Sequence, residues 1–123
     1  MQEAELLLSA LERTREKNIL VIVEGKKDQA ALERLGIRNI LAISRTPLYK
    51  ITDRIIAREK TVILLVDLDT EGRKIYHKLA QELQKHKIKI DNTLRDLLFQ
   101  TPLRHIEGLD TYLRTQDKHP SDL

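Results

Sequence analysis

The chain has 123 residues, of which 41% are hydrophobic and 33% charged, and its formal net charge is +3. This length fits one compact domain with a real core, and the mild positive charge permits a nucleic-acid partner without demanding one. The absence of cysteine excludes disulfides and thiolate metal sites, and no apolar run is long enough to span a membrane. No signal peptide is visible, so we expect a cytoplasmic single-domain protein over residues 1–123 that makes no membrane contact.

The first predicted element is a helix over residues 3–17. Apolar residues recur there at three-to-four spacing, acidic residues come early and basic residues come late, which suits the helix dipole. Leu7, Leu8 and Leu11 belong to the expected apolar stripe. The other leucines, Leu6 among them, serve either a dimer contact or the core of the domain itself, so a homodimer or a partner protein stays open.

Strands and helices are then predicted to alternate along the chain. Residues 19–23 form a continuous and mostly β-branched apolar run, which is typical of a strand buried on both faces. Gly25 breaks that run, and Gly36 follows the next helix at a position that favours glycine. The expected elements after the first strand are a helix at 26–35, a strand at 39–43, a helix from Pro47 to about Arg58, a strand at 61–66, a helix at 71–86, a strand at 88–90, a helix at 93–99 and a turn or helix at 108–114. The polar tail at 116–123 is expected to fray.

This alternation predicts the fold class. Apolar strands separated by helices indicate right-handed βαβ units and a sheet covered by helices on both faces. We therefore expect a three-layer, Rossmann-like α/β domain with about four mainly parallel strands, and with its core between about residues 19 and 115. In such sheets the functional groups gather at the carboxyl ends of the strands.

Acidic residues follow the two most apolar strands. Glu24 ends the first strand, and Asp67 and Asp69 end the strand at 61–66. Side chains alternate along extended backbone, so Asp67 and Asp69 are expected to point to the same side. If the two strands are neighbours, the three carboxylates converge and repel one another unless a cation is present. Mg²⁺, with Mn²⁺ as a substitute, is the natural candidate because it takes oxygen ligands and shares substrate phosphates.

Glycines and basic residues accompany both acidic strand ends. Gly25 and Gly72 remove side-chain bulk where a backbone or a phosphate has to come close. An acidic centre with basic residues around it suits metal-assisted phosphoryl transfer. The expected phosphate or nucleic-acid contacts are Lys26, Lys27, Arg45, Arg73 and Lys74. Arg45 is read equally well as a solvated surface residue.

Ordinary structural roles compete with this interpretation. Asp69 or Thr70 suits a helix N-cap, and Glu24 suits an ion pair with a nearby lysine. One Asp-x-Asp by itself is a weak signal. Two acidic strand ends, each followed by glycine and by the basic start of a helix, favour a metal site over these separate structural roles.

The two motifs together resemble the Toprim domain, from about residue 19 to residue 90. That domain occurs in type IA and type II topoisomerases, DnaG-type primases, OLD-family nucleases, RecR proteins and the ribonucleases that mature 5S ribosomal RNA. Val-Glu-Gly-Lys-Lys-Asp is most similar to the last group and to small stand-alone Toprim proteins. The resemblance implies that Glu24 is a general acid/base or metal ligand, that Asp67 and Asp69 bind Mg²⁺, and that Glu71 is a third acidic position. Ser44 to Pro47 replace the small glycine turn of many members.

Three classes of function compete under this resemblance. The first is a metal-dependent nuclease acting on RNA or DNA, in RNA processing or in DNA repair or replication. The second is a non-catalytic module that binds nucleic acid or recruits a partner, as in RecR. The third is a primase-like or nucleotidyl-transferase-like fragment that works with a partner. In the first class, Glu24 moves the proton.

Several other residues receive structural predictions. Aromatic residues are too few for a base-stacking platform, so nucleic-acid contacts are expected at phosphates, and Tyr76 is expected to pack in the core. The four histidines show no metal-ligand spacing, so solvated surface positions are expected for them. Asp28 is expected to orient a neighbouring Lys or Arg. The segment at 104–110 either returns over the sheet edge with Arg104 or Glu107, or is a helix N-terminus with solvated charges.

Overall fold

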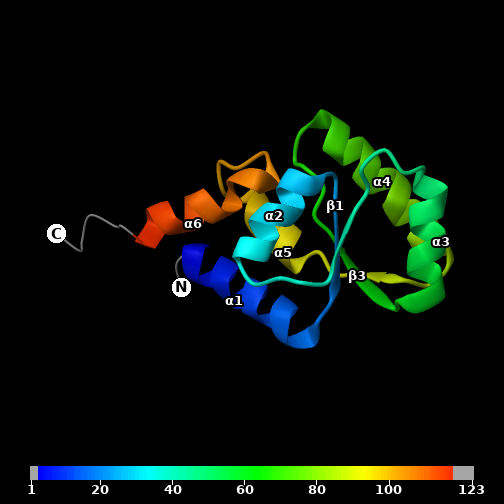
Figure 1. The fold of residues 1–123 in the computed structure, drawn as a ribbon, viewed down its shortest axis with the longest axis horizontal. Coiled ribbons are helices and arrows are strands. Elements are labelled where there is room, and N and C mark those ends of the chain that lie inside the picture. Colours follow the sequence, from blue (N-terminus) through cyan, green and yellow to red (C-terminus); the bar gives the residue numbers. More distant parts are fainter. Residues whose placement is uncertain (1–2, 118–123) are drawn as a thin grey trace.

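The structure is a computed structural model that describes residues 3–117, with the side chains of residues 116 and 117 left undescribed. Its sheet has four strands in the order β2-β1-β3-β4, and every neighbouring pair is parallel. The strands are β1 (Leu20–Val23), β2 (Ile40–Ala42), β3 (Thr61–Leu64) and β4 (Lys89–Ile90). Helices cover both faces of the sheet (Figure 1), which confirms the predicted three-layer, Rossmann-like α/β fold.

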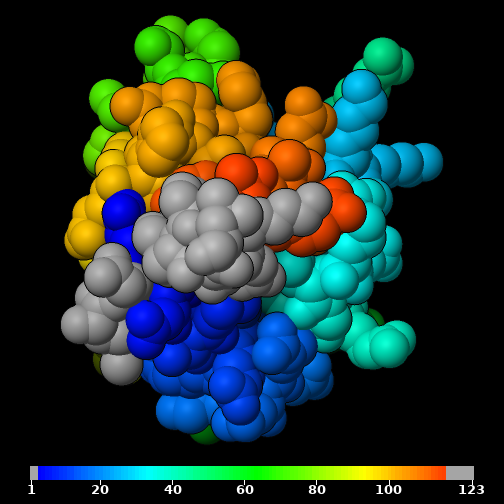
Figure 2. All heavy atoms as spheres, turned by 90° about the vertical axis from the view of Figure 1, so that its left-hand side faces the viewer, coloured from blue at the N-terminus to red at the C-terminus, as the bar shows by residue number. Residues whose placement is uncertain are grey.

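The two faces of the sheet bury different hydrophobic clusters. One cluster includes Val21, Val23 and Ile63, while the alternate strand residues Ile22 and Val62 belong to the other. The first face is covered by α1 (Glu3–Lys17), α2 (Lys26–Arg34), α5 (Thr93–Phe99), the 3₁₀ turn η1 (Ile106–Gly108) and α6 (Leu109–Asp117). The second is covered by α3 (Leu48–Arg58) and α4 (Thr70–Lys85). Figure 2 looks onto the first layer, where α6 lies with α1 below it and α2 to its right.

The N-terminal helix differs from its predicted apolar stripe at one position. Leu7 and Leu11 are fully buried, as expected, whereas Leu8 is 44% exposed. Leu8 lies one residue, or about 100°, around the helix from Leu7, and the residues of α1 in the buried core are Leu7, Ala10 and Leu11. Leu6 is also exposed, at 37%, and lies outside the core clusters.

The ends of the elements depart from prediction by a few residues. Gly36 lies just beyond α2 with φ of 86°, which confirms the expected glycine stop. β3 ends at Leu64, two residues before the predicted end of the strand, and beyond it the carbonyl of Val66 accepts a hydrogen bond from the Arg95 guanidinium at 2.8 Å. Residues 116 and 117 of the predicted polar tail continue α6, and residues 118–123 lie outside the described residues. No helix among the described residues has the length and apolar character to cross a bilayer.

Candidate functional site

The carboxyl ends of β1 and β3 meet at the upper side of the sheet in Figure 1. The last backbone bond between them joins the Leu65 N–H to the carbonyl of Ile22, at 2.8 Å. Beyond that point a side chain replaces the backbone as acceptor: Oε2 of Glu24 accepts the N–H of Asp67 at 2.7 Å. The Glu24 carboxylate therefore fixes the position of the neighbouring strand end.

The environment of Glu24 favours its neutral form. Burial raises the pKa of this carboxyl, and the hydrogen bond from the Asp67 N–H opposes the rise. The negative charges of Asp67, Asp69 and Asp28 raise the pKa of Glu24 further. A carboxyl held in this way is suited to exchanging a proton nearer neutral pH than an ordinary glutamate.

Asp67 joins the end of β3 to the turn η1. Its Oδ1 accepts the backbone N–H of Ile106 at 3.0 Å, and its Oδ2 lies 3.2 Å from Nδ1 of His105. Both oxygens thus have partners on a segment almost forty residues further along the chain. Two contacts from consecutive residues therefore hold the carboxylate in one orientation.

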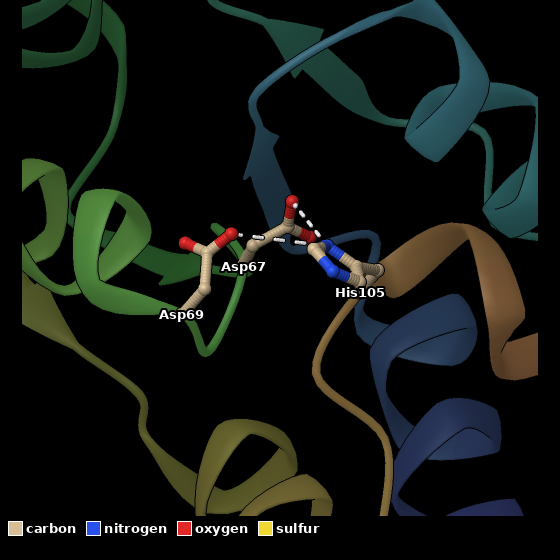
Figure 3. A group of neighbouring side chains, drawn as sticks. All are labelled: Asp67, Asp69 and His105. Atoms are coloured by element: carbon tan, nitrogen blue, oxygen red, sulfur yellow. Dashed lines mark hydrogen bonds and ion pairs between the residues drawn. The ribbon is translucent and has the colours of Figure 1, made fainter.

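Asp69 performs the capping role and also faces the site. Its Oδ1 accepts the N–H of Gly72 at 2.8 Å, which makes it the N-cap of α4. Its Oδ2 lies 3.9 Å from Nδ1 of His105. Figure 3 shows both aspartates turned toward the imidazole, so the capping bond through Oδ1 leaves Oδ2 of Asp69 facing His105.

His105 completes a three-residue donor group that the sequence did not predict. Asp67, Asp69 and His105 each offer one ligand atom, and these atoms lie within 4.8 Å of one another. The hydrogen bond to Asp67 and the charge of that aspartate raise the pKa of His105. His105 is exposed, as expected of a surface histidine, but its contacts with the two aspartates were not expected.

The segment at 104–110 returns over the sheet edge, as the first of its two predictions stated, and it also leads into η1 and α6 with exposed charges, as the second stated. The Leu68 N–H donates to the carbonyl of Arg104 at 2.9 Å, and the buried side chains of Ile106 and Leu109 anchor the turn. The Arg104 side chain turns back to the carbonyl of Leu103, and Glu107 is exposed. The segment therefore brings His105 and a backbone N–H to the aspartates, in place of Arg104 or Glu107.

The donor group fits a divalent cation. Carboxylate oxygens are ligands for Mg²⁺ and Mn²⁺, and imidazole nitrogen is a ligand for most transition ions. Of the predicted ligands, the structure brings Asp67 and Asp69 together in this group, while Glu24 contacts the Asp67 backbone instead. The side chain of Glu71 is 78% exposed and lies 3.6 Å from Nζ of Lys74, outside the group.

The two predicted glycines differ in their surroundings. A Cβ added at Gly72 would lie 1.9 Å from the backbone oxygen of Asp67, so only glycine lets the first turn of α4 come this close to β3. A Cβ added at Gly25 would meet nothing within 4 Å. Gly72 therefore serves a close approach of backbone, and Gly25 leaves open space beside Glu24.

Asp28 has a different role from the one expected. Its Oδ2 accepts the backbone N–H of Gly25 at 3.1 Å, which closes the first turn of α2. Burial raises the pKa of Asp28, and the N–H of Gly25 opposes that rise. The side chain secures the backbone next to Glu24 and orients neither a lysine nor an arginine among the described side chains.

The predicted basic residues lie where the strands pass into helices. They are exposed, and they begin α2, follow β2 and begin α4: Lys26, Lys27, Arg45, Arg73 and Lys74. The light-blue start of α2 and the blue-green connection after β2 extend beyond the body of the molecule at the upper right of Figure 2. Arg45 has φ of 63°, so the loop holds a left-handed turn without using glycine. Lys74 pairs with Glu71, and the Arg73 guanidinium lies 5.5 Å from the Phe99 ring centre.

Arg95, a buried arginine beneath the site, is a second residue that the sequence pattern did not predict. Arg95 is 4% exposed, donates to the carbonyl of Val66, and stacks on the Tyr76 ring at 4.4 Å. Tyr76 is half-buried and bonds to Asn92, which agrees with its predicted packing role. Burial lowers the pKa of Arg95, yet a guanidinium stays charged in proteins. The position of Arg95 between Leu94 and Leu98, on the apolar side of α5, was the one sequence feature that could have indicated its burial.

Comparisons with known proteins agree with this geometry. The family model of the Toprim domain matches residues 18–93. A UPF0292 protein of Methanocaldococcus jannaschii is 37% identical over 98 residues, covering 76% of this chain and 77% of the relative. A UPF0292 protein of Methanosarcina barkeri is 32% identical over 118 residues, covering 92% and 82%.

A solved structure agrees as well. A protein from Aquifex aeolicus superposes with a TM-score of 0.75 at 29% identity, covering 83% of this chain and 94% of that one. Its fold matches the observed helices and parallel sheet. The chain belongs to the Toprim domain family, and this membership supports a metal-dependent, nucleic-acid-related function.

Proposed function

We propose that this chain is a cytoplasmic, Mg²⁺-dependent nuclease that cleaves RNA or DNA. One observation carries the proposal: Glu24, Asp67 and Asp69 meet at adjacent strand ends, and no lysine or arginine pairs with them among the described side chains. Negative charge gathered without a lysine or arginine to balance it is suited to binding a cation from solution.

Each residue of the site has a defined part in this reaction. Asp67 and Asp69 would hold the cation, with Glu71 as an outer participant. Bound Mg²⁺ stabilises negative charge that develops on a phosphate during cleavage. Glu24, with its raised pKa, exchanges the proton of the attacking or leaving oxygen. The open space at Gly25 leaves room for the phosphate beside that carboxyl.

The exposed cations support a nucleic-acid substrate. Lys26 and Lys27 at the start of α2, together with Arg45, lie at the same sheet edge as the carboxylates and would contact phosphates. Contacts of this kind carry little sequence information and make binding salt-dependent. The chain is therefore expected to select its substrate by shape more than by base sequence.

A non-catalytic binding module is the second candidate. The Oε2 atom of Glu24 already accepts the Asp67 N–H at 2.7 Å, which is a structural task that needs no chemistry. In that case the acidic edge would bind a cation that supports a nucleic acid or a protein partner without cleavage.

A cleavage assay separates the two candidates. Purified protein is incubated with structured RNA, duplex DNA and single-stranded DNA, in Mg²⁺, Mn²⁺ or EDTA. Glu24→Gln keeps an acceptor for the Asp67 N–H and removes the exchangeable proton, so we expect metal-dependent cleavage to fall at least about 100-fold, in line with the usual contribution of general acid–base catalysis.

The matched control is Glu82→Gln, an exposed change that removes only a surface pair with Lys85 on α4. This control should cleave like the natural chain. Cleavage that survives EDTA, or that is equal in Glu24→Gln and the natural chain, contradicts the proposed mechanism. Salt-sensitive binding without cleavage favours the binding module.

A further inference from the structure

We propose that His105 is a metal ligand and that it gives the site at Asp67 and Asp69 a preference for transition ions such as Co²⁺ and Zn²⁺ over Mg²⁺. This inference rests on the proposed metal site and concerns which cation that site selects. The three donors come from the end of β3, the start of α4 and the loop before η1.

The separations between the donors suit one shared ion. Nδ1 of His105 lies 3.2 Å from Oδ2 of Asp67 and 3.9 Å from Oδ2 of Asp69. Ligands bound at about 2.0–2.2 Å from one ion are separated by roughly 3.0–4.4 Å, depending on the coordination angle. Both observed distances fall within that interval, and all three donor atoms lie within 4.8 Å of one another, so the donors are close enough to share one ion.

The backbone on both sides of His105 is tied to the aspartate segment. The carbonyl of Arg104 accepts the Leu68 N–H at 2.9 Å, and the N–H of Ile106 donates to Oδ1 of Asp67 at 3.0 Å. The buried Ile106 side chain anchors the same turn in the core. Although its side chain is 57% exposed, His105 is therefore carried on a fixed piece of backbone.

The chemistry of the donors determines the preference. Mg²⁺ favours oxygen ligands and gives up water reluctantly, so an imidazole adds little to its binding. Imidazole suits Co²⁺ and Zn²⁺, and the affinity of a mixed nitrogen–oxygen site rises along the first-row series from Mn²⁺ to Cu²⁺. Two carboxylates alone would discriminate less between Mg²⁺ and the later transition ions.

A simple ion pair between His105 and Asp67 makes a different prediction. In that case the imidazole only competes with the cation for the carboxylates. Removal of His105 would then strengthen the binding of every divalent ion by a similar factor. The ratio of the affinities for Co²⁺ and Mg²⁺ therefore separates a ligand from a competitor.

The test measures the affinities for Co²⁺ and Mg²⁺ at about pH 8. The protein carries no histidine tag, because such a tag would itself bind Co²⁺. Co²⁺ is titrated by calorimetry and by its visible absorption, and Mg²⁺ by competition. His105→Ala removes the imidazole, and His105→Asn keeps an N–H that can donate to Asp67. The control His86→Ala removes an exposed imidazole at the end of α4, away from the donor group.

We expect both His105 variants to lose at least about tenfold in affinity for Co²⁺, since removing even an outer-shell partner commonly costs 10- to 100-fold. Their affinity for Mg²⁺ should change much less, and His86→Ala should leave both affinities unchanged. An unchanged ratio of the two affinities in the His105 variants overturns the inference and leaves the proposed metal site intact. A natural chain that binds no ion, or binds ions equally well after Asp67→Asn with Asp69→Asn, overturns the metal site itself.

Discussion

Two groups of carboxylates in this molecule are neutralised in opposite ways. Asp91 and Asp110 are each 8% exposed, and each pairs with arginine. Asp91 lies 2.9 Å from Arg13, and Asp110 lies 2.9 Å from Arg34. We call these two the arginine-paired carboxylates, and their charge is balanced inside the fold.

Glu24, Asp67 and Asp69, here called the edge carboxylates, have no such partner among the described side chains. Each accepts a main-chain N–H instead, at 2.7 Å, 3.0 Å and 2.8 Å respectively. Dipoles of this kind orient a carboxylate without cancelling its charge. Arginine thus balances the charge of Asp91 and Asp110, whereas the edge carboxylates, where the strand ends meet, keep charge that an external cation can balance.

The largest effect that we predict comes from Gly72, which lies against the backbone of Asp67 and is not itself one of the edge carboxylates. Gly72→Ala places a Cβ 1.9 Å from the Asp67 backbone oxygen, so the start of α4 must move away from β3. We expect a loss of at least about 3 kcal/mol in the free energy of unfolding, despite the better helix propensity of alanine. Chemical denaturation measures it.

Gly25→Ala is the matched control, because nothing lies within 4 Å of the added Cβ and the backbone there is extended, with φ of −145°. Its unfolding free energy should stay within about 0.5 kcal/mol of the natural chain. Equal losses in the two variants would show that α4 does not depend on this close approach.

Neutralising the edge carboxylates should abolish Mn²⁺ binding and spare stability, whereas neutralising an arginine-paired carboxylate should lower stability and spare Mn²⁺ binding. Asp67→Asn with Asp69→Asn keeps the acceptors for the Ile106 and Gly72 N–H groups and removes the charge. We expect Mn²⁺ binding to disappear by calorimetry. The stability of the metal-free protein should hold or rise, because repulsion with Glu24 is relieved.

Asp91→Asn is the counterpart among the arginine-paired carboxylates. It loses the charge that faces Arg13, so the unfolding free energy should fall by about 1 kcal/mol. Its Mn²⁺ binding should match that of the natural chain. Loss of Mn²⁺ binding in Asp91→Asn, or its survival in the double variant, would remove the distinction between the two groups.

The smallest effect that we predict is on the pH dependence of the free energy of unfolding, which should differ in sign between Asp91 and Glu24. Burial raises the pKa of Asp91, but the Thr93 N–H and Arg13 outweigh it, so the pKa lies below its ordinary value. That carboxyl therefore contributes stability above its unfolded pKa of about 3.9, and the contribution is lost as the pH falls through the folded value. The pKa of Glu24 is raised, so its contribution is present below about 4.3 and is lost as the pH rises through the folded value.

Unfolding curves from acid to neutral pH measure these contributions. Asp91→Asn should lose stability only above acid pH. Glu24→Gln should gain a few tenths of a kcal/mol at neutral pH and nothing in acid. Parallel pH profiles for the two variants would contradict the opposite signs.

Local patterns in the sequence were sufficient to predict the fold and two of the three residues of the donor group. Continuous apolar runs marked β1 and β3, and two-residue alternation placed Asp67 and Asp69 on one side. The capping of α4 by Asp69 was available from the same segment. These features depend on neighbouring residues, so a pattern of a few positions carries them.

His105 and Arg95 could not be placed in the same way. His105 lies 38 positions after Asp67 and reaches it by a loop, and no spacing rule relates residues so far apart. Arg95 is a charged residue in a short helix, yet it is buried and donates to the carbonyl of Val66, just beyond the end of β3. The exposure of Leu8 and of Glu71 likewise depends on which neighbouring elements cover them. Tertiary closure, which the sequence pattern does not contain, determines each of these positions.

Anomalous diffraction from crystals of the protein soaked in Mn²⁺ tests the central claim most directly. The account predicts a peak within about 2.5 Å of carboxylate oxygens from both Asp67 and Asp69, at the carboxyl ends of β1 and β3. A saturating soak that leaves this edge without a peak, or that places Mn²⁺ only at other surface carboxylates, would contradict it.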